Sequence, residues 1–117
     1  SDATLDFDKI VLHYPSLSKL TLKKEMFYID TIIIKDVKSR YVSLINKKGK
    51  GIKFSFNNFS TFSIWTPHNE APFVCLEPWQ GYNDKCTTNG KYDTKDNLVH
   101  LNPNEEYNCS YTIELLK

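Results

Sequence analysis

The chain has 117 residues and a mass of 13.6 kDa, the size of one domain, and should expose about 6,600 Å² of the roughly 19,700 Å² that it presents when unfolded. Its 15 basic and 14 acidic residues give a net charge of +1, which excludes the strongly basic surface of a nucleic-acid-binding domain. No apolar run approaches the ~20 residues of a membrane-spanning helix, and no signal peptide is recognisable. We expect one soluble domain over residues 1–117 with a substantial core.

The composition favours strands over helices. Thr, Val, Ile, Tyr, Phe and Trp make up 39 of the 117 residues, whereas alanine occurs twice. A short helix could compete only within Lys19–Phe27. Nine short segments separated by Pro, Gly and Asn predict an all-β sandwich or barrel. In chain order they are Phe7–Tyr14, Lys19–Leu22, Phe27–Ile34, Tyr41–Asn46, Gly51–Phe56, Thr61–Thr66, Phe73–Glu77, Leu98–Leu101 and Ser110–Leu116.

The most informative carboxylate is Glu77. Alternation places it on one strand face with Phe73 and Cys75, and Pro78 is expected to end the strand directly after it. A carboxylate shielded beside apolar groups should have a raised pKa, which suits a general base. The alternatives are an edge-strand glutamate in solvent and a structural ion pair.

Asp30 poses a similar question. Alternation over Phe27–Ile34 puts it on a face that is otherwise apolar or aromatic, together with Tyr28 and Ile32. A buried, unpaired carboxylate would cost several kcal/mol, on the order of the penalty for any buried charge without a partner. We therefore expect Asp30 to titrate, to bond to a partner or to face a cleft.

Aromatic and polar residues alternate after Glu77. Trp79, Tyr82 and Asp84 follow within seven residues, a mixture typical of carbohydrate sites because rings stack on sugar C–H faces while polar groups bind hydroxyls. The segment 81–97 is long for a connection in so small a domain, so it is a candidate wall of the site. The alternative is a loop whose aromatic residues pack on its own sheet.

No pattern indicates a metal or a cofactor. The cysteines are odd in number and lack a Cys-x-x-Cys spacing, which favours neither a disulfide framework nor a zinc site and fits a reducing cytoplasm. The histidines are scattered without the spacing of metal ligands. These residues are Cys75, Cys86 and Cys109, and His13, His68 and His100.

Several blocks of the chain resemble the C-terminal part of the aldose 1-epimerase (galactose mutarotase) family. The Glu-Pro-Trp of residues 77–79 resembles a bacterial branch in which it replaces the Glu-Thr-Gln of the better-known members. The resemblance covers nearly the whole chain, with its most specific part at Phe73–Trp79. The blocks that carry it are Ser63–Thr66, Ala71–Asp84, Leu101–Tyr107 and Ser110–Ile113, with Glu25–Ile32 and Lys38–Leu44 upstream.

The resemblance implies an antiparallel β-sandwich that forms the C-terminal portion of a galactose-mutarotase-like supersandwich. Such proteins bind an aldose in an open cleft and interconvert its α and β anomers without a cofactor. A glutamate takes the proton of the C1 hydroxyl while a histidine protonates the ring oxygen. By motif position the base falls on Glu77, a sugar ligand on Asp30, and cleft aromatics on Trp65 and Trp79, with Asp84 in the same block. Asn104 stands where glycine is usual and should tolerate a left-handed turn.

The family's members are more than twice this length, and their histidine acid and sugar-binding arginine lie in an N-terminal half without a counterpart here. We therefore expect this chain to supply the base but not the acid toward a hexose or hexose phosphate. Exposed sheet edges should favour self-association or docking with a missing N-terminal half. Residues 1–3 look like the remnant of a purification tag.

Two other functions can be weighed from the sequence. A carbohydrate-binding module would keep the cleft without the chemistry. An immunoglobulin-like interaction domain draws support from Tyr107 two residues before Cys109, the spacing of a tyrosine corner. It fails on the cysteines, because Cys75 and Cys86 lie too near to be the partner of an intersheet disulfide.

Overall fold

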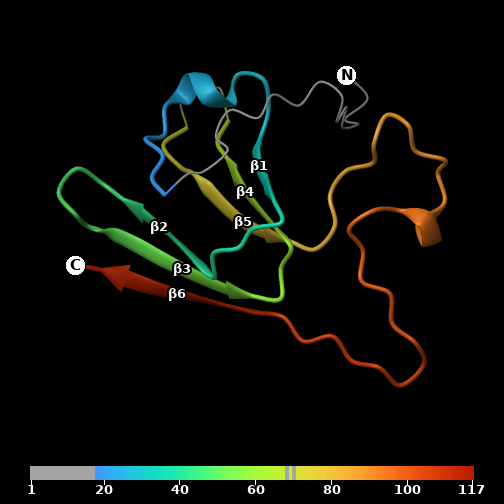
Figure 1. Ribbon diagram of the computed structural model, residues 1–117. Helices are drawn as coiled ribbons and strands as arrows, with labels where there is room; N and C mark the ends of the chain where they lie inside the picture. Colours follow the sequence, from blue (N-terminus) through green and yellow to red (C-terminus); the bar gives the residue numbers. More distant parts are fainter. Residues whose placement is uncertain (1–17, 68, 70) are drawn as a thin grey trace.

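The computed structural model describes residues 18–67, 69 and 71–117, and its described part is all-β, as predicted (Figure 1). Neighbouring strands are antiparallel in two three-stranded sheets, β1-β4-β5 and β2-β3-β6. No helix in this part is long and apolar enough to cross a membrane. The elements are η2 (Lys24–Phe27), β1 (Ile32–Lys35), β2 (Tyr41–Ile45), β3 (Gly51–Asn57), β4 (Thr61–Trp65), β5 (Cys75–Trp79), η3 (Tyr92–Thr94) and β6 (Ser110–Leu116), where η denotes a 3-10 turn.

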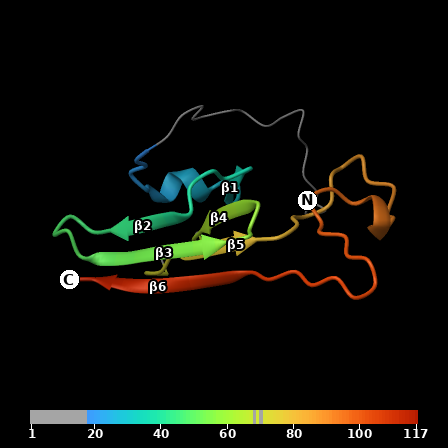
Figure 2. The ribbon, with the colours of Figure 1, turned by 60° about the horizontal axis from the view of Figure 1, so that its bottom comes forward.

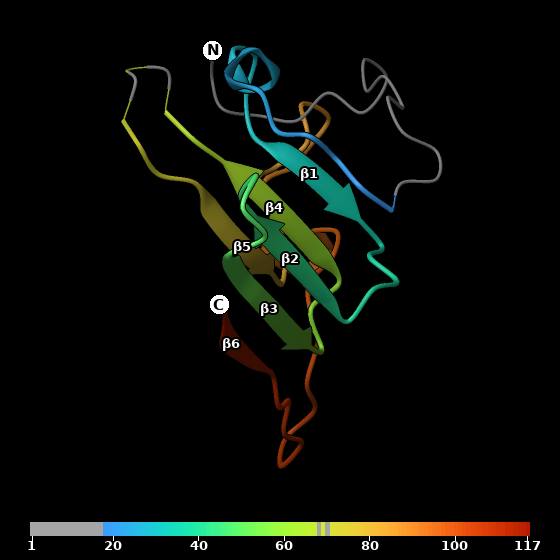
Figure 3. The same ribbon diagram turned by 90° about the vertical axis from the view of Figure 1, so that its left-hand side faces the viewer.

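The two sheets pack on each other as a sandwich through a small aromatic core. In Figure 3 the strands of both sheets run along nearly the same diagonal. Phe62 of β4 is fully buried, with its ring stacked on Phe56 at 4.9 Å and edge-on to Phe54 at 6.0 Å, both from β3. Half-buried apolar side chains surround these rings: Val37, Val42, Phe59, Ile64 and Leu76. The core therefore lies between β3 and β4, the central strands of the two sheets.

The expectation of a substantial core is wrong. In the described part of the chain, the buried hydrophobic side chains are Phe27, Phe54, Phe56 and Phe62. Three-stranded sheets bury little beyond their central strands, so much of the apolar surface stays at the edges.

Three predicted strands are wrong or shortened, and one cannot be compared. Phe27–Ile34 begins instead with the turn η2, anchored by the buried Phe27, and the strand starts only at Ile32. Lys19–Leu22 and Leu98–Leu101 form no strand. Leu98 packs close to Gly81 instead, 3.1 Å from where a Cβ there would lie. The predicted strand Phe7–Tyr14 lies outside the described residues.

The remaining strands match to within two residues at either end, and the predicted turns lie between them. In the β2–β3 hairpin the Asn46 side chain accepts the backbone N–H groups of Lys48 at 2.8 Å and Lys50 at 3.1 Å, while Gly49 adopts a φ of +82°. Asn104 has a φ of +70°, which confirms the left-handed turn expected there. Asparagine and glycine thus set the chain reversals.

Candidate functional site

The candidate site occupies the outer face of the sheet β1-β4-β5, the side turned away from the core. Side chains alternate along strands, so Phe62, Ile64 and Leu76 point to the core and their neighbours point outward. The antiparallel register sets Ser63 directly opposite Glu77. We call this surface the Glu77 face; its residues are Ile33, Lys35, Thr61, Ser63, Trp65, Cys75, Glu77 and Trp79.

The prediction that Pro78 ends the strand at Glu77 is wrong, because β5 continues to Trp79. Among the described strands, β5 pairs only with β4, so it is an edge strand. An edge strand tolerates a residue that has no N–H to donate. Because side chains alternate along a strand, Pro78 lies on the core side and Trp79 lies on the same face as Glu77.

Two side chains hold one oxygen of the Glu77 carboxylate. Trp79 Nε1 donates to Glu77 Oε2 over 3.0 Å, and Ser63 Oγ donates to the same oxygen over 3.3 Å. Ser63 has no exposed surface, while Glu77 itself is half-buried. Hydrogen bonds that converge on one carboxylate oxygen from two strands fix the orientation of the group.

Cys75 lies next to Glu77 on the same face. Burial raises the pKa of the Cys75 thiol, the negative charge of Glu77 raises this pKa further, and so does a hydrogen bond between the two side chains. The thiol therefore stays protonated at neutral pH. A protonated thiol beside the carboxylate is a further donor to it, and a poor nucleophile.

One end of the Glu77 face is closed by the residue that ends the long loop. Asn97 Nδ2 donates to the buried Thr61 Oγ1 over 2.9 Å, and Asn97 Oδ1 accepts from Ser60 Oγ over 2.7 Å. Gln80 Nε2 donates to the Asn97 carbonyl over 3.1 Å. These bonds tie both ends of the loop to the start of β4 and the end of β5, as expected of a loop that forms a wall or packs on its own sheet.

The loop 81–97 also folds upon itself. Two ion pairs close it: Lys85 with Asp96, and Lys95 Nζ with Asp84 Oδ1 at 2.8 Å. They flank a polar cavity of about 200 Å³ inside the loop. Tyr82 lines this cavity and also lies under the Lys35 ammonium, which is 5.4 Å from the ring centroid, so the cavity borders the Glu77 face.

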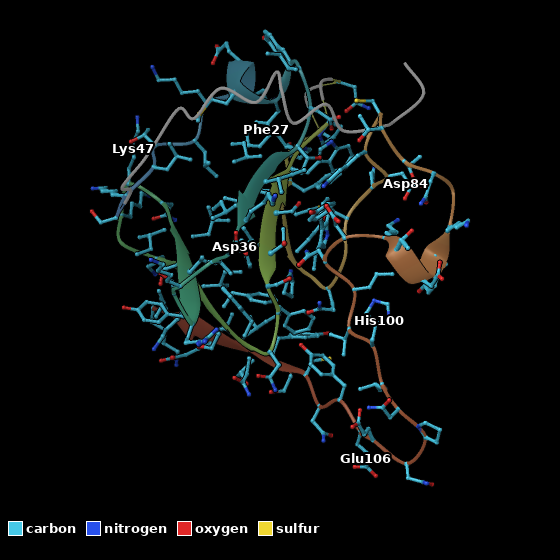
Figure 4. The ribbon with its side chains drawn as sticks, turned by 45° about the vertical axis from the view of Figure 1, so that its right-hand side comes forward. Phe27, Asp36, Lys47, Asp84, His100 and Glu106 are labelled. Atoms are coloured by element: carbon cyan, nitrogen blue, oxygen red, sulfur yellow. The ribbon has the colours of Figure 1, made fainter. Side chains whose placement is uncertain are left out.

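The structure brings three of the five predicted site residues together. Trp65, Glu77 and Trp79 share the Glu77 face, where the Trp65 ring lies 6.1 Å from that of Phe73. Asp84 lies instead in the loop cavity, paired with Lys95 (Figure 4).

Asp30 lies before β1 and is not part of the face. Its side chain is exposed and accepts the N–H of Thr31 over 2.6 Å. The expectation that Asp30 shares an apolar strand face is wrong, because the strand begins only at Ile32. The sequence analysis expected bonding to a partner as one outcome for Asp30, and the hydrogen bond from the Thr31 N–H is that outcome.

Sequence reasoning missed Ser63, Asn97 and Lys35. Ser63 alternates with Phe62 and Ile64 in an apolar strand, a signal that it faces away from the core, but the sequence does not give the register that sets it opposite Glu77. Asn97 was one polar residue among many in the loop. Its role depends on a contact with Thr61, 36 positions away.

No group of three or more His, Cys, Asp or Glu in the described part of the chain could hold a metal ion. His100 is exposed on the segment that leads to β6 (Figure 4), and His13 and His68 lie outside the described residues. Cys75, Cys86 and Cys109 are all free thiols. None of them is paired in the structure, so the structure offers no support for an immunoglobulin-like intersheet disulfide.

The chain is similar to protein LacX of Lactococcus lactis subsp. lactis. The chromosomal and plasmid forms of LacX are each 32% identical to it over 98 residues, which cover 83% of this chain and 33% of LacX. The chain thus spans about one third of the length of these curated relatives. No family model matches the sequence, and no solved structure matches it.

Proposed function

We propose that this chain is the base-bearing part of an aldose 1-epimerase-like protein, which binds a hexose and interconverts its α and β anomers. The observation that supports this most is the oriented carboxylate of Glu77 on an outward sheet face, held by Trp79 and Ser63. The Glu-Pro-Trp motif that resembles the family falls on this carboxylate. Aromatic groups on both sides of Glu77 suit a sugar ring.

In the proposed reaction, Glu77 takes the proton from the C1 hydroxyl of the ring form. The O1 electron pair then forms the C1 carbonyl, the bond from C1 to the ring oxygen breaks, and that oxygen takes up a proton. Rotation about C1–C2 turns the other carbonyl face toward the C5 hydroxyl. The reverse proton transfers close the ring as the opposite anomer, and Glu77 ends in its starting state.

The rest of the Glu77 face fits binding better than acid catalysis. Trp65 and Trp79 offer apolar ring faces. Ser63 and Cys75 already hydrogen-bond to Glu77. No histidine lies among the described residues of the face. The proton for the ring oxygen is therefore assigned to water or to a part of the longer protein. Asp30 and Asp84 stay predicted ligands of sugar hydroxyls.

A non-catalytic carbohydrate-binding module is the second candidate. It is favoured by the same absence of a histidine on the Glu77 face and by the polar cavity that borders it at Tyr82. Both candidates bind a sugar beside the tryptophans. They differ in whether the Glu77 carboxylate is needed for turnover or only adjusts affinity.

Tryptophan fluorescence and polarimetry together separate the two functions. Both tryptophans of the chain lie on the Glu77 face, so fluorescence reports on this surface alone. The enzyme requires a sugar-dependent fluorescence change and a faster approach of α-glucose to equilibrium that is lost in Glu77→Gln. The matched control is Glu106→Gln, an exposed carboxylate on the loop between η3 and β6 (Figure 4). Unchanged fluorescence at high glucose would contradict both candidates.

A further inference from the structure

The cavity of the loop 81–97 is built from the loop alone. It has a volume of about 200 Å³, and its lining residues all lie between Tyr82 and Asp96. In Figure 2 the loop lies beyond the end of β5, to one side of the two sheets. Because every wall comes from one described segment, the shape of the cavity needs no residue from elsewhere in the protein.

Hydrogen bonds within the loop set this shape. The Asn89 side chain accepts the Lys91 N–H over 2.9 Å and donates to Thr94 Oγ1 over 3.1 Å. The Thr88 N–H donates to the Lys85 carbonyl over 3.0 Å. Together with the two ion pairs, these bonds order the loop before a ligand arrives, which lowers the entropic cost of binding.

The charges that line the cavity cancel. Asp84 pairs with Lys95, and Asp96 pairs with Lys85, so the lining favours neither a cation nor an anion. The other lining groups are hydroxyls, amides and the Tyr82 ring. Donors and acceptors placed side by side suit a neutral ligand with many hydroxyl groups. The volume lies below the ~300 Å³ at which pockets for drug-sized ligands begin, so it suits a single sugar ring.

The cavity opens to solvent on the side of its threonines. Thr87 and Thr88 are exposed, whereas Tyr82, Asp84 and Lys95 are half-buried. An exposed apolar surface calls for a polypeptide to cover it, but a polar cavity that is open to water does not. The occupant that its chemistry favours is therefore a small polar molecule.

The cavity adjoins the end of the Glu77 face where Trp79 lies. Trp79 is two residues beyond Glu77 on β5, about 7 Å along the strand at ~3.3 Å per residue. Lys35 and Trp79 both lie opposite Thr61, on its two sides. The Lys35 ammonium in turn lies 5.4 Å from the ring centroid of Tyr82, which lines the cavity. A ligand that starts at Glu77 and passes Trp79 therefore reaches the cavity.

We propose that the loop cavity binds the second sugar unit of a reducing disaccharide, whose first unit presents its C1 hydroxyl to Glu77. This inference rests on the proposed function, because the first unit occupies the Glu77 face. Trp79 lies beside the bond that joins the two units. The carboxylates of the loop accept hydrogen bonds from hydroxyls of the second unit, and the ammonium groups donate to them.

The test compares maltose, cellobiose and lactose with glucose in titrations of tryptophan fluorescence. At least one disaccharide should bind roughly fivefold more tightly than glucose, the effect of a single additional hydrogen bond. Thr87→Tyr fills the cavity and should abolish this advantage while the affinity for glucose stays unchanged. Thr112→Tyr is the matched control, because it makes the same change at an exposed position of β6, and it should keep the advantage.

Correlation NMR of the backbone amides locates the second unit without a variant. The disaccharide should shift the signals of residues 82–96, and glucose at equal occupancy should not. Equal affinity for all four sugars would overturn the proposal and leave the hexose site at Glu77 intact. So would an advantage that survives Thr87→Tyr or is lost equally in Thr112→Tyr. Binding of none of the four sugars would contradict the proposed function as well.

Discussion

The indole Nε1 of Trp79 donates a hydrogen bond to Glu77 Oε2 over 3.0 Å, although a proline separates the two residues along the strand. Pro78 cannot donate to a neighbouring strand, but β5 is an edge strand and needs no donor there. The strand therefore continues past the proline and brings the indole back beside the carboxylate. The Glu-Pro-Trp motif thus has a structural consequence: it places a carboxylate and a hydrogen-bond donor to it on one strand face.

Removing the indole donor should impair catalysis more than binding. We expect Trp79→Phe to lower kcat for anomer exchange roughly tenfold, because an oriented hydrogen bond to a charged group is worth about 1.5 kcal/mol. Trp65→Phe is the comparison, because Trp65 shares the face without a bond to Glu77 in the structure, and it should act mainly on KM. Steady-state polarimetry over a range of glucose concentrations separates the two effects. Equal loss of kcat in both variants would contradict the positioning role.

The alternation of side chains along a strand made much of the Glu77 face predictable from the sequence. Cys75 and Glu77 on one side and Leu76 on the other follow from a period of two, and the structure agrees. Ser63 could not be assigned to the carboxylate, since its place depends on the β4–β5 register. Asp30 was misplaced because a 3-10 turn at Lys24–Phe27 interrupts what reads as one strand.

Nonlocal contacts explain the other failures. The bond from Asn97 to Thr61 joins residues 36 positions apart, and no periodicity signals it. Asp84 was grouped with Trp79 because they are close in sequence, but an ion pair with Lys95 holds it within the loop. Chain length also overstated the core, because the scaling with mass assumes a compact domain, whereas the apolar side chains of β6 are exposed.

The Cys75 thiol provides a chemical probe of the Glu77 charge. Its raised pKa should make it alkylate more slowly at pH 8 than the exposed Cys86 and Cys109. Glu77→Gln removes the negative charge, so Cys75 should then react a few-fold faster, on the order expected for a modest fall in a thiol pKa. Mass spectrometry of iodoacetamide-labelled peptides gives the three rates separately. An unchanged Cys75 rate in Glu77→Gln would show that the two side chains do not interact.

The same pKa makes stability depend on pH. Because the folded chain keeps the Cys75 proton above the ordinary value of 9.0, where the unfolded chain has lost it, the free energy of unfolding should fall as the pH rises above 9. Cys75→Ala should flatten this fall. Urea titrations between pH 8 and pH 10.5 measure it; a stability of the unmodified chain that rises over this range would contradict the assigned direction.

Phe62 is the residue on which the two sheets depend most. It is fully buried between Phe54 and Phe56, so Phe62→Ala should lower the free energy of unfolding by about 3–5 kcal/mol. Phe73→Ala removes the same atoms from a half-exposed ring outside the core and should cost less than about 1.5 kcal/mol. Urea denaturation monitored by circular dichroism compares them. Similar losses in the two variants would place the core elsewhere.

The turn at Asn104 requires a left-handed backbone conformation. Its φ of +70° is costly for a residue with an ordinary side chain, so Asn104→Ala should destabilise the chain by about 1 kcal/mol. Asn104→Gly should be nearly neutral, because glycine adopts this conformation freely. Both values come from urea denaturation under the same conditions. A loss in Asn104→Gly as large as that in Asn104→Ala would mean that the asparagine side chain, and not the backbone conformation, is required.

The most direct measurement is the exchange rate between α- and β-glucose by saturation-transfer NMR, for the chain, for Glu77→Gln and for Glu106→Gln. If Glu77 is the base, as proposed, and no histidine lies among the described residues of the Glu77 face, we predict a weak acceleration that is proportional to the concentration of the chain, retained in Glu106→Gln and abolished in Glu77→Gln. An acceleration that survives Glu77→Gln, or none at any concentration of the chain, would contradict the assignment of Glu77 as the base of an aldose 1-epimerase-like site.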